Sequence, residues 1–191
     1  MWQRTAGEGR YTQVEREQRW VLDILPDGLD RPVSIVDLYV TGTRLRLRRM
    51  ESDAAIVYRL GQKVRAEPEN PETVKLTTMY LSQQEHSILG RLGGAEIRKT
   101  RWRWPGAEPR MAVDEFQGPL AGLVLAEVEL GPDERRLGHP PLSVADVTDD
   151  DRFSGGTLSE TTETELGLLL AEVGVRRPAP DRPRRRPSST P

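Results

Sequence analysis

Residues 43–50 read TRLRLRRM, a stretch in which arginine and leucine alternate from Arg44 to Arg48. Arg44, Arg46 and Arg48 occupy every second position, and Leu45 and Leu47 stand between them. Side chains at every second position of a β-strand point to the same side of the sheet. The stretch is therefore predicted to be a strand with a leucine face and an arginine face, and the arginine face is expected to meet water or an anion.

The same period of two recurs along most of the chain. The alternating runs are separated by turn signals such as Pro26-Asp27-Gly28 and Thr41-Gly42. Consecutive strands joined by short turns favour an antiparallel meander, and eight strands are enough to close into a barrel. The pattern predicts eight strands, at residues 11–24, 33–40, 43–50, 54–65, 73–81, 95–104, 110–116 and 122–130.

Two segments show helical patterns instead. Ser82 followed by Glu85 is a capping-box sequence, and the helix that it predicts ends at Gly93-Gly94. A second helix is predicted from about Leu158 to Val173. The expected fold class is therefore α+β, with a closed eight-stranded antiparallel β tunnel and flanking helices.

Length and composition limit the classes of protein that this chain can belong to. The 191 residues suit one domain of ordinary size. With no cysteine and two histidines, a thiolate zinc site and a histidine cluster are both excluded, so any metal must have oxygen ligands, as magnesium, manganese and calcium prefer. The chain has no apolar stretch of membrane-spanning length, and its first residues lack the apolar run of a secretory signal. We expect a cytoplasmic protein that does not bind membranes.

The last sixteen residues differ from the rest in composition. Residues 176–191 contain six arginines, five prolines and one aspartate, a composition that cannot form a packed core. We expect a tunnel domain over residues 1–175 and a disordered tail over residues 176–191. The tail is interpreted either as a solubilising segment or as an electrostatic arm for nucleic acid, polyphosphate or an acidic partner.

Paired carboxylates mark the first and the last predicted strand. Glu15 and Glu17 share a strand face with Arg19, and Glu127 and Glu129 alternate with apolar residues in the sequence LAEVEL. Two carboxylates side by side repel each other unless a divalent cation lies between them. Either pair alone is typical of a solvated strand face, but closure of a barrel would bring the first and last strands together. The two pairs therefore predict a metal site.

A complementary set of basic residues lies on other predicted strands. Lys99, Arg101 and Arg103 alternate in IRKTRWRW, as the arginines do in residues 43–50, and Lys63 and Lys75 extend the set. Arginine side chains match the oxygen geometry of phosphate, so such a wall would bind a triphosphate. An ordinary charged outer face would explain one such strand, but explains the recurrence less economically. Motifs of the common nucleotide-binding and hydrolase folds, such as the P-loop, do not occur.

In this order, the motifs resemble those of the CYTH, or triphosphate tunnel metalloenzyme, superfamily over roughly residues 11–170. The family's E-x-E-x-K strand is similar to residues 15–19, although Arg19 stands where the family has lysine. Lys75 and Thr77 stand where several relatives carry further acidic groups. The family's basic motifs follow: R-x-R is similar to Arg44 through Arg48, the lysine strand to Lys63, and K-x-R to Lys99-Thr100-Arg101. The acidic motifs come last: the aspartate strand is similar to Asp114, E-x-E to Glu127-Val128-Glu129, and E-V-T to Asp146-Val147-Thr148.

The resemblance implies an eight-stranded tunnel in which glutamates bind Mg²⁺ or Mn²⁺ and basic residues bind a triphosphate. We expect a metal-dependent triphosphatase that hydrolyses inorganic tripolyphosphate or an organic triphosphate, acting as a monomer or homodimer. The alternatives are a class IV-type adenylate cyclase and a non-catalytic protein that binds polyphosphate or a phosphorylated ligand. The expected metal ligands are Glu15, Glu17, Asp114, Glu127 and Glu129; the expected substrate-binding residues are Arg44, Arg46, Arg48, Lys75, Lys99 and Arg101; the expected catalytic residues are Arg19 and Lys63.

Overall fold

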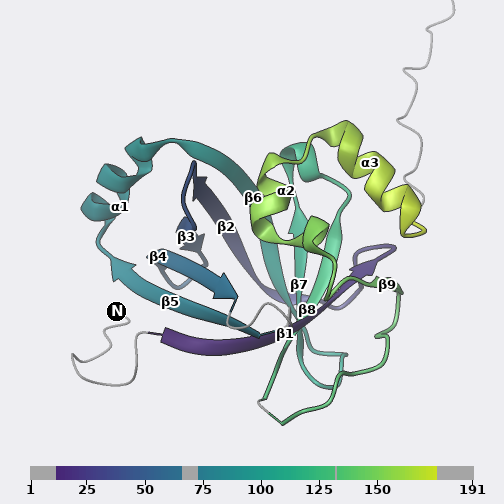
Figure 1. Ribbon diagram of the computed structural model, residues 1–191. Helices are drawn as coiled ribbons and strands as arrows, with labels where there is room; N and C mark the ends of the chain where they lie inside the picture. The colour runs from purple at the N-terminus through teal and green to yellow at the C-terminus, as the bar shows by residue number, and fades with distance from the viewer. Residues whose placement is uncertain (1–11, 66–72, 132, 176–191) are drawn as a thin grey trace, which may run out of the picture.

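The computed structural model describes residues 12–65, 73–131 and 133–175, which form one antiparallel sheet and three short α-helices (Figure 1). The strands are β1 (Thr12–Leu22), β2 (Asp30–Val40), β3 (Leu45–Glu51), β4 (Ile56–Arg65), β5 (Thr73–Leu81), β6 (Gly94–Trp104), β7 (Met111–Phe116), β8 (Val124–Leu130) and β9 (Ser143–Asp146). The helices are α1 (Gln83–Leu89), α2 (Gly155–Glu160) and α3 (Glu163–Glu172).

Strand β1 closes the sheet into a barrel. The order of strands is β5-β4-β3-β2-β6-β7-β8-β1, and β1 pairs with β5 as well as with β8. Residues 12–16 of β1 pair with β5, and residues 16–21 pair with β8. The long β1 therefore joins both ends of the eight-stranded sheet, and its last residues also pair with the short β9. The expected closed antiparallel barrel with flanking helices is confirmed. The expected simple meander is wrong, because β2 pairs with β6 and β1 pairs with β5 and β8, so β1–β2 and β5–β6 are not neighbours.

All eight predicted strands occur, with ends that differ by a few residues; the predicted start at Tyr11 and the predicted tail lie outside the described residues. The four-residue strand β9 was not predicted. The predicted helix at Ser82 is confirmed as α1, with both hydrogen bonds of the capping box between Ser82 and Glu85.

The prediction of one helix from Leu158 to Val173 is wrong, because this segment is divided into α2 and α3. Ser154 caps α2, which therefore starts before the predicted position. Thr161 is extended and ends α2, and Thr162 forms a second capping box with Glu165. Threonine and glutamate three residues apart satisfy the free N–H groups of a new helix, which favours a fresh start over a continuous helix. Among the described helices, none has the length and apolar character that crossing a bilayer requires.

Helices α2 and α3 lie together beside the barrel (Figure 1) and pack into one hydrophobic core. Phe153, Leu158 and Leu166 of this segment pack with Val21 of β1 and Leu125 of β8. Val21 has the strand parity of Glu17 and Arg19, so its side chain points into the barrel. Apolar side chains from the helices therefore fill one part of the barrel interior, and the rest of the interior is left to polar residues.

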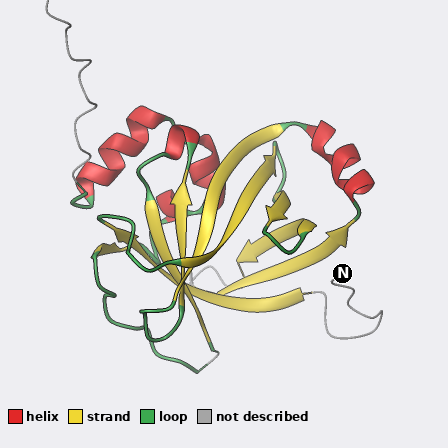
Figure 2. Ribbon diagram, turned by 180° about the vertical axis from the view of Figure 1, so that it is seen from behind, coloured by secondary structure: helices red, strands yellow, loops and turns green. Residues whose placement is uncertain are grey.

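A second core lies on the outer face of β1, β7 and β8. Trp20, Val113 and Ala126 are fully buried there, and Trp104 is nearly so. The loop residues Leu25, Leu29 and Leu137 pack against this cluster. Figure 2 shows several loops, in green, gathered at the end of the barrel away from the helices. Trp102 and Trp104 belong to this outer cluster, so both are packing residues, as expected.

Candidate functional site

A cavity of about 550 Å³ lies inside the barrel. Residues that are directly opposite in neighbouring strands point to the same side of the sheet. The strand pairings therefore identify, strand by strand, which residues face the inside of the barrel. The residues that line this tunnel cavity are Glu15, Glu17, Arg19, Tyr39, Thr43, Arg44, Arg46, Arg48, Arg59, Gly61, Lys63, Leu76, Thr78, Lys99, Arg101, Glu127, Glu129, Thr148, Asp151, Ser154, Gly155 and Gly156.

Strands β3, β4 and β6, with the turn before β3, carry the cationic side of the cavity. We call this set the basic wall: Arg44, Arg46, Arg48, Arg59, Lys63, Lys99 and Arg101. The opposite pairs Arg48 with Arg59 and Arg46 with Gly61 show that β3 and β4 present the same face. Sequence reasoning missed Arg59. The signal was present, because Arg59 and Lys63 have the same strand parity.

Strands β1 and β8 carry the anionic side of the cavity. Glu17 lies directly opposite Glu129, and Arg19 lies opposite Glu127. Like charges directly opposite each other destabilise a sheet unless something lies between them. Burial raises the pKa of Glu15; Lys63 opposes this, and the nearby charges of Glu17 and Glu129 add to the rise. The predicted meeting of the two carboxylate pairs is thus observed.

The two sides of the cavity touch through ion pairs. Lys63 Nζ donates to Glu17 Oε1 and Oε2 at 3.2 and 3.1 Å, and it lies 3.4 Å from Glu15 Oε2. Burial alone would raise the pKa of Glu17, but Lys63 and then Arg19 outweigh burial and lower this pKa to about 2. Arg101 Nη2 donates to Glu127 Oε2. Cations predicted to bind phosphate and carboxylates predicted to bind metal are therefore direct partners.

Asp114 lies beneath the basic wall, where we had expected a metal ligand. It is fully buried and does not line the cavity. Arg101 donates from Nε and Nη2 to the two oxygens of Asp114, each at 2.6 Å, and Lys99 donates to Oδ2. Because its oxygens are occupied by these two cations, Asp114 acts here as the partner that orients Lys99 and Arg101.

Asp37 has the same arrangement with β3, and sequence reasoning missed it. Arg48 donates from Nε and Nη2 to the two oxygens of Asp37, at 2.5 and 2.6 Å, and Arg46 Nε lies 3.7 Å from Oδ1. Burial acts to raise the pKa of Asp37, but Arg48 and Arg46 reverse the effect and hold it below its usual value. Arg48 is thus tied to Asp37, whereas Arg46 is held more loosely.

Lys75 is the expected substrate-binding residue that the structure places elsewhere. It is exposed, and its neighbour Leu76 lines the cavity together with Thr78. Adjacent residues of a strand point to opposite faces, so Lys75 lies on the outside of the barrel. The sequence KLTTMY contains no clean alternation, which is why it gave no reliable parity for this strand.

Arg19 connects the cavity with the segment before α2. Its Nη1 donates to the carbonyl oxygen of Phe153 at 3.1 Å, and its backbone N–H donates to Thr148 Oγ1 at 3.0 Å. Thr148 Oγ1 in turn donates to Asp146 Oδ1 at 2.6 Å. The Asp146-Val147-Thr148 motif therefore anchors this segment to β1 beside the cavity.

Tyr39 and Gly155 bring the barrel and the start of α2 close together. A Cβ atom on Gly155 would lie 1.9 Å from the hydroxyl oxygen of Tyr39, so a larger residue has no room there. Both residues line the cavity. Glycine at position 155 thus allows the start of α2 to form part of the cavity wall.

The four cavity glutamates fit a divalent metal by their chemistry, since hard cations prefer carboxylate oxygens. Within the described part of the chain, however, no three acidic or histidine side chains are grouped closely enough to hold an ion as they stand. Both oxygens of Glu17 are bonded to Lys63, and Glu127 Oε2 is bonded to Arg101. The carboxylate oxygens that a metal ion would need are present, and two of the glutamates are paired with Lys63 and Arg101.

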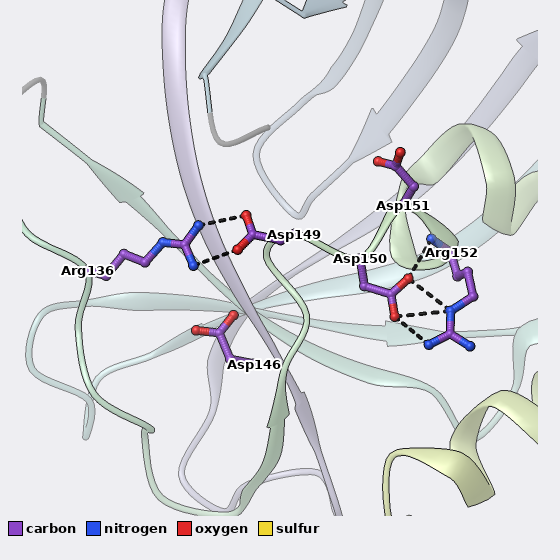
Figure 3. A pocket seen from close by; sticks show the side chains of 6 residues that line it. All are labelled: Arg136, Asp146, Asp149, Asp150, Asp151 and Arg152. Carbon is purple, nitrogen blue, oxygen red and sulfur yellow. Dashed lines mark hydrogen bonds and ion pairs between the residues drawn. The ribbon is translucent and has the colours of Figure 1, made fainter. Parts of the chain in front are cut away.

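A second, open pocket lies outside the barrel and is lined by Arg136, Asp146, Asp149, Asp150, Asp151 and Arg152 (Figure 3). Arg136 donates to both oxygens of Asp149, at 2.8 and 2.7 Å. Arg152 is paired with Asp150 in the same way and also donates to Glu172. This pocket is a network of surface ion pairs, which leaves the tunnel cavity as the better candidate site.

No family model matches the sequence, and no curated protein matches it. Among solved structures, NE1496 matches twice. One structure, described as a hypothetical protein, has a TM-score of 0.54 at 22% identity and covers 78% of this chain and 99% of that chain. The other, described as the inorganic triphosphatase NE1496, has a TM-score of 0.53 at 22% identity and covers 77% and 95%. The PH1819 protein from Pyrococcus horikoshii OT3 has a TM-score of 0.45 at 16% identity and covers 85% and 92%. The chain thus has the fold of the inorganic triphosphatase NE1496, a closed antiparallel barrel around a polar cavity.

Proposed function

We propose that this chain is a member of the triphosphate tunnel metalloenzyme superfamily that hydrolyses inorganic tripolyphosphate or an organic triphosphate with Mg²⁺ or Mn²⁺. One observation carries the proposal: a single cavity joins seven basic side chains on one side with two pairs of glutamates on the other. This combination suits a highly charged anion bound together with divalent cations. The shared fold with the inorganic triphosphatase NE1496 supports it.

The basic wall has the chemistry to hold the phosphate chain. Arg44, Arg46 and Arg59 offer guanidinium donors that match phosphate oxygens in pairs. Fixed positive charges in a partly buried cavity stabilise the charge that shifts to the leaving oxygen when water attacks the terminal phosphorus. Asp37 and Asp114 keep Arg48, Lys99 and Arg101 in place from below. Binding and orientation are therefore the contributions of this wall.

The four glutamates would hold the metal. Glu15, Glu17, Glu127 and Glu129 supply carboxylate oxygens from two adjacent strands. When bound there, a divalent ion supplies charge neutralisation and a polarised water. Neither His86 nor His139 is among the residues that line the cavity, so the described site offers no histidine base.

The structure favours hydrolysis over cyclisation of a nucleotide. Tyr39 is the single aromatic residue in the described lining, and its hydroxyl lies against Gly155. A nucleotide cyclase has to recognise a base and a ribose as well as the triphosphate, and bases are commonly held by stacking on aromatic rings or by a dedicated pocket. A lining made mainly of charged side chains suits an all-phosphate substrate better.

Phosphate release from tripolyphosphate, ATP and thiamine triphosphate, each with Mg²⁺, Mn²⁺ or EDTA, tests the proposal, with cyclic AMP measured in the ATP reactions. We expect metal-dependent release of phosphate from at least one substrate. Formation of cyclic AMP would instead support the cyclase, and tight binding without any turnover would support a non-catalytic phosphate-binding protein.

A further inference from the structure

Two of the cavity glutamates are bonded to two of the cations that are proposed to bind substrate. Lys63 Nζ lies within 3.2 Å of both oxygens of Glu17, and Arg101 Nη2 donates to Glu127. A carboxylate that binds an ammonium group through both oxygens presents no free pair of oxygens to a metal ion. An ammonium group bound in this way likewise has fewer donors left for phosphate. Each ion pair therefore engages one proposed metal ligand and one proposed phosphate-binding group at the same time.

The geometry at Arg101 allows the pair to open without loss of orientation. Arg101 Nη2 carries two hydrogens, and its two acceptors are Asp114 Oδ2 and Glu127 Oε2. Arg101 Nε is bonded to the other oxygen of Asp114. If Glu127 leaves, the guanidinium stays fixed by Asp114 and gains one free N–H directed into the cavity. The same exchange at Glu17 frees donors of the Lys63 ammonium group, which stays 3.4 Å from Glu15 Oε2.

We infer that Glu17 and Glu127 act as internal competitors of the phosphate substrate, and that their transfer to a divalent cation releases Lys63 and Arg101 for phosphate. The inference rests on the proposed function and goes beyond it, because it gives these residues a second role that is independent of hydrolysis. Metal and phosphate binding then favour each other, since two ligands that break the same internal contact are coupled reciprocally. The ion pairs also keep the charges of the free cavity compensated.

Glu129 provides a charge-matched control. It lines the same cavity and lies opposite Glu17 in the strand register. Within residues 12–65, 73–131 and 133–175, no side chain donates a hydrogen bond or an ion pair to it. Replacing any of these three glutamates with glutamine removes one negative charge from the cavity, but only Glu17→Gln and Glu127→Gln remove an internal partner of a cation.

The test is calorimetric titration of tripolyphosphate into wild-type protein, Glu17→Gln, Glu127→Gln and Glu129→Gln, all in EDTA, after thermal melting has shown that each variant is folded. We expect Glu17→Gln and Glu127→Gln to bind tripolyphosphate about three- to tenfold more tightly than Glu129→Gln, an effect between that of an exposed ion pair and that of a buried charged hydrogen bond. Equal affinities for the three variants, or no measurable binding by Glu17→Gln and Glu127→Gln, would overturn the inference. Because Glu17 and Glu127 lie on different strands, each variant is an independent test if the other fails to fold.

Failure of the inference is distinguishable from failure of the proposed function. Wild-type protein titrated with tripolyphosphate in the presence of Mg²⁺ or Mn²⁺ reports on the function. Binding and turnover there, together with equal affinities of the three variants in EDTA, would leave the triphosphatase standing and remove the competition. The absence of both binding and turnover with either metal would contradict the proposed function itself.

Discussion

Arg48 and Asp37 form a bidentate ion pair inside the barrel, with N–O distances of 2.5 and 2.6 Å, and both side chains are buried. Asp37 belongs to β2, and Arg48 lies directly opposite it in β3. Arg48 lines the cavity with its positive charge, and Asp37 neutralises that charge from within the barrel wall. A buried charge without a partner is costly, so this contact should matter for folding as well as for the site.

Replacing Asp37 with asparagine should destabilise the fold strongly. The substitution leaves the buried guanidinium of Arg48 without its counter-charge, for which the expected loss in free energy of unfolding is about 3–5 kcal/mol. Urea unfolding measures this loss. The exposed pair of Glu96 with Arg98 serves as control, and Glu96→Gln should change stability by no more than about 0.5 kcal/mol. Similar effects of the two substitutions would contradict the account.

The stabilising effect of Asp37 should also depend on pH. Arg48 and Arg46 hold the pKa of Asp37 below its usual value against the opposing effect of burial. A carboxyl group with a lowered pKa in the folded state stabilises the protein above its unfolded-state pKa, near 4, and this stability is lost as the pH falls through the folded pKa. The difference in stability between wild type and Asp37→Asn should therefore shrink below about pH 4. A difference that is constant down to about pH 3 would exclude this linkage.

Neutralising a glutamate on β8 should abolish metal-dependent turnover and keep the fold. Glu127→Gln and Glu129→Gln each remove an oxygen donor from the proposed metal site, and glutamine has nearly the same shape. We expect phosphate release to fall to background at limiting Mg²⁺ or Mn²⁺, with an unchanged thermal melting temperature for Glu129→Gln. Normal rates at limiting metal in both variants would remove these residues from the metal site.

Arg46 and Lys99 should each contribute to substrate binding. Loss of a charge-assisted hydrogen bond to phosphate corresponds to about 1.5–3 kcal/mol, so Arg46→Ala and Lys99→Ala should lower kcat/KM accordingly. Lys75→Ala is the matched control, because it removes the same charge from the outer face of β5. Its kcat/KM should stay near the wild-type value. If Arg46→Ala and Lys99→Ala behave like Lys75→Ala below saturation, the basic wall has no part in the reaction.

Removing residues 176–191 should leave the melting temperature and the hydrolysis of tripolyphosphate nearly unchanged. The Arg- and Pro-rich composition of this segment offers no apolar face to bury. Thermal unfolding and phosphate release compare the two forms. A melting temperature lower by about 5 °C or more would show that the segment packs against the barrel.

Alternation of charged with uncharged residues over 44–48 and 99–104 explains why much of the site could be predicted from the sequence. In residues 43–50 and 95–104 each charged residue has an apolar or uncharged neighbour, so the parity of Arg46 and Lys99 was clear before the structure. Closure of the barrel then brought Glu17 opposite Glu129, as expected for the first and last predicted strands. Parity depends only on local sequence, whereas the pairing of β2 with β6 and of β1 with β5 joins strands that are far apart in the chain.

The parts that could not be predicted depend on contacts between distant segments. Asp37 gives no local sign that Arg48 will hold it, and Asp114 gives no local sign of its contacts with Lys99 and Arg101 on another strand. Strand β9 has four residues, too few to show a period, and its place is set by pairing with β1. Such features follow from register and burial in the closed barrel, which local patterns do not contain.

Crystals of the wild-type protein grown with Mn²⁺ and an imido analogue of tripolyphosphate, which resists hydrolysis, test the central claim most directly. We predict an anomalous Mn²⁺ signal inside the barrel, coordinated by glutamates of β1 and β8, with analogue phosphates bonded to Arg46 and with Lys63 moved away from Glu17. Mn²⁺ and analogue bound only outside the tunnel cavity, for example at the acidic surface pocket, would contradict the account.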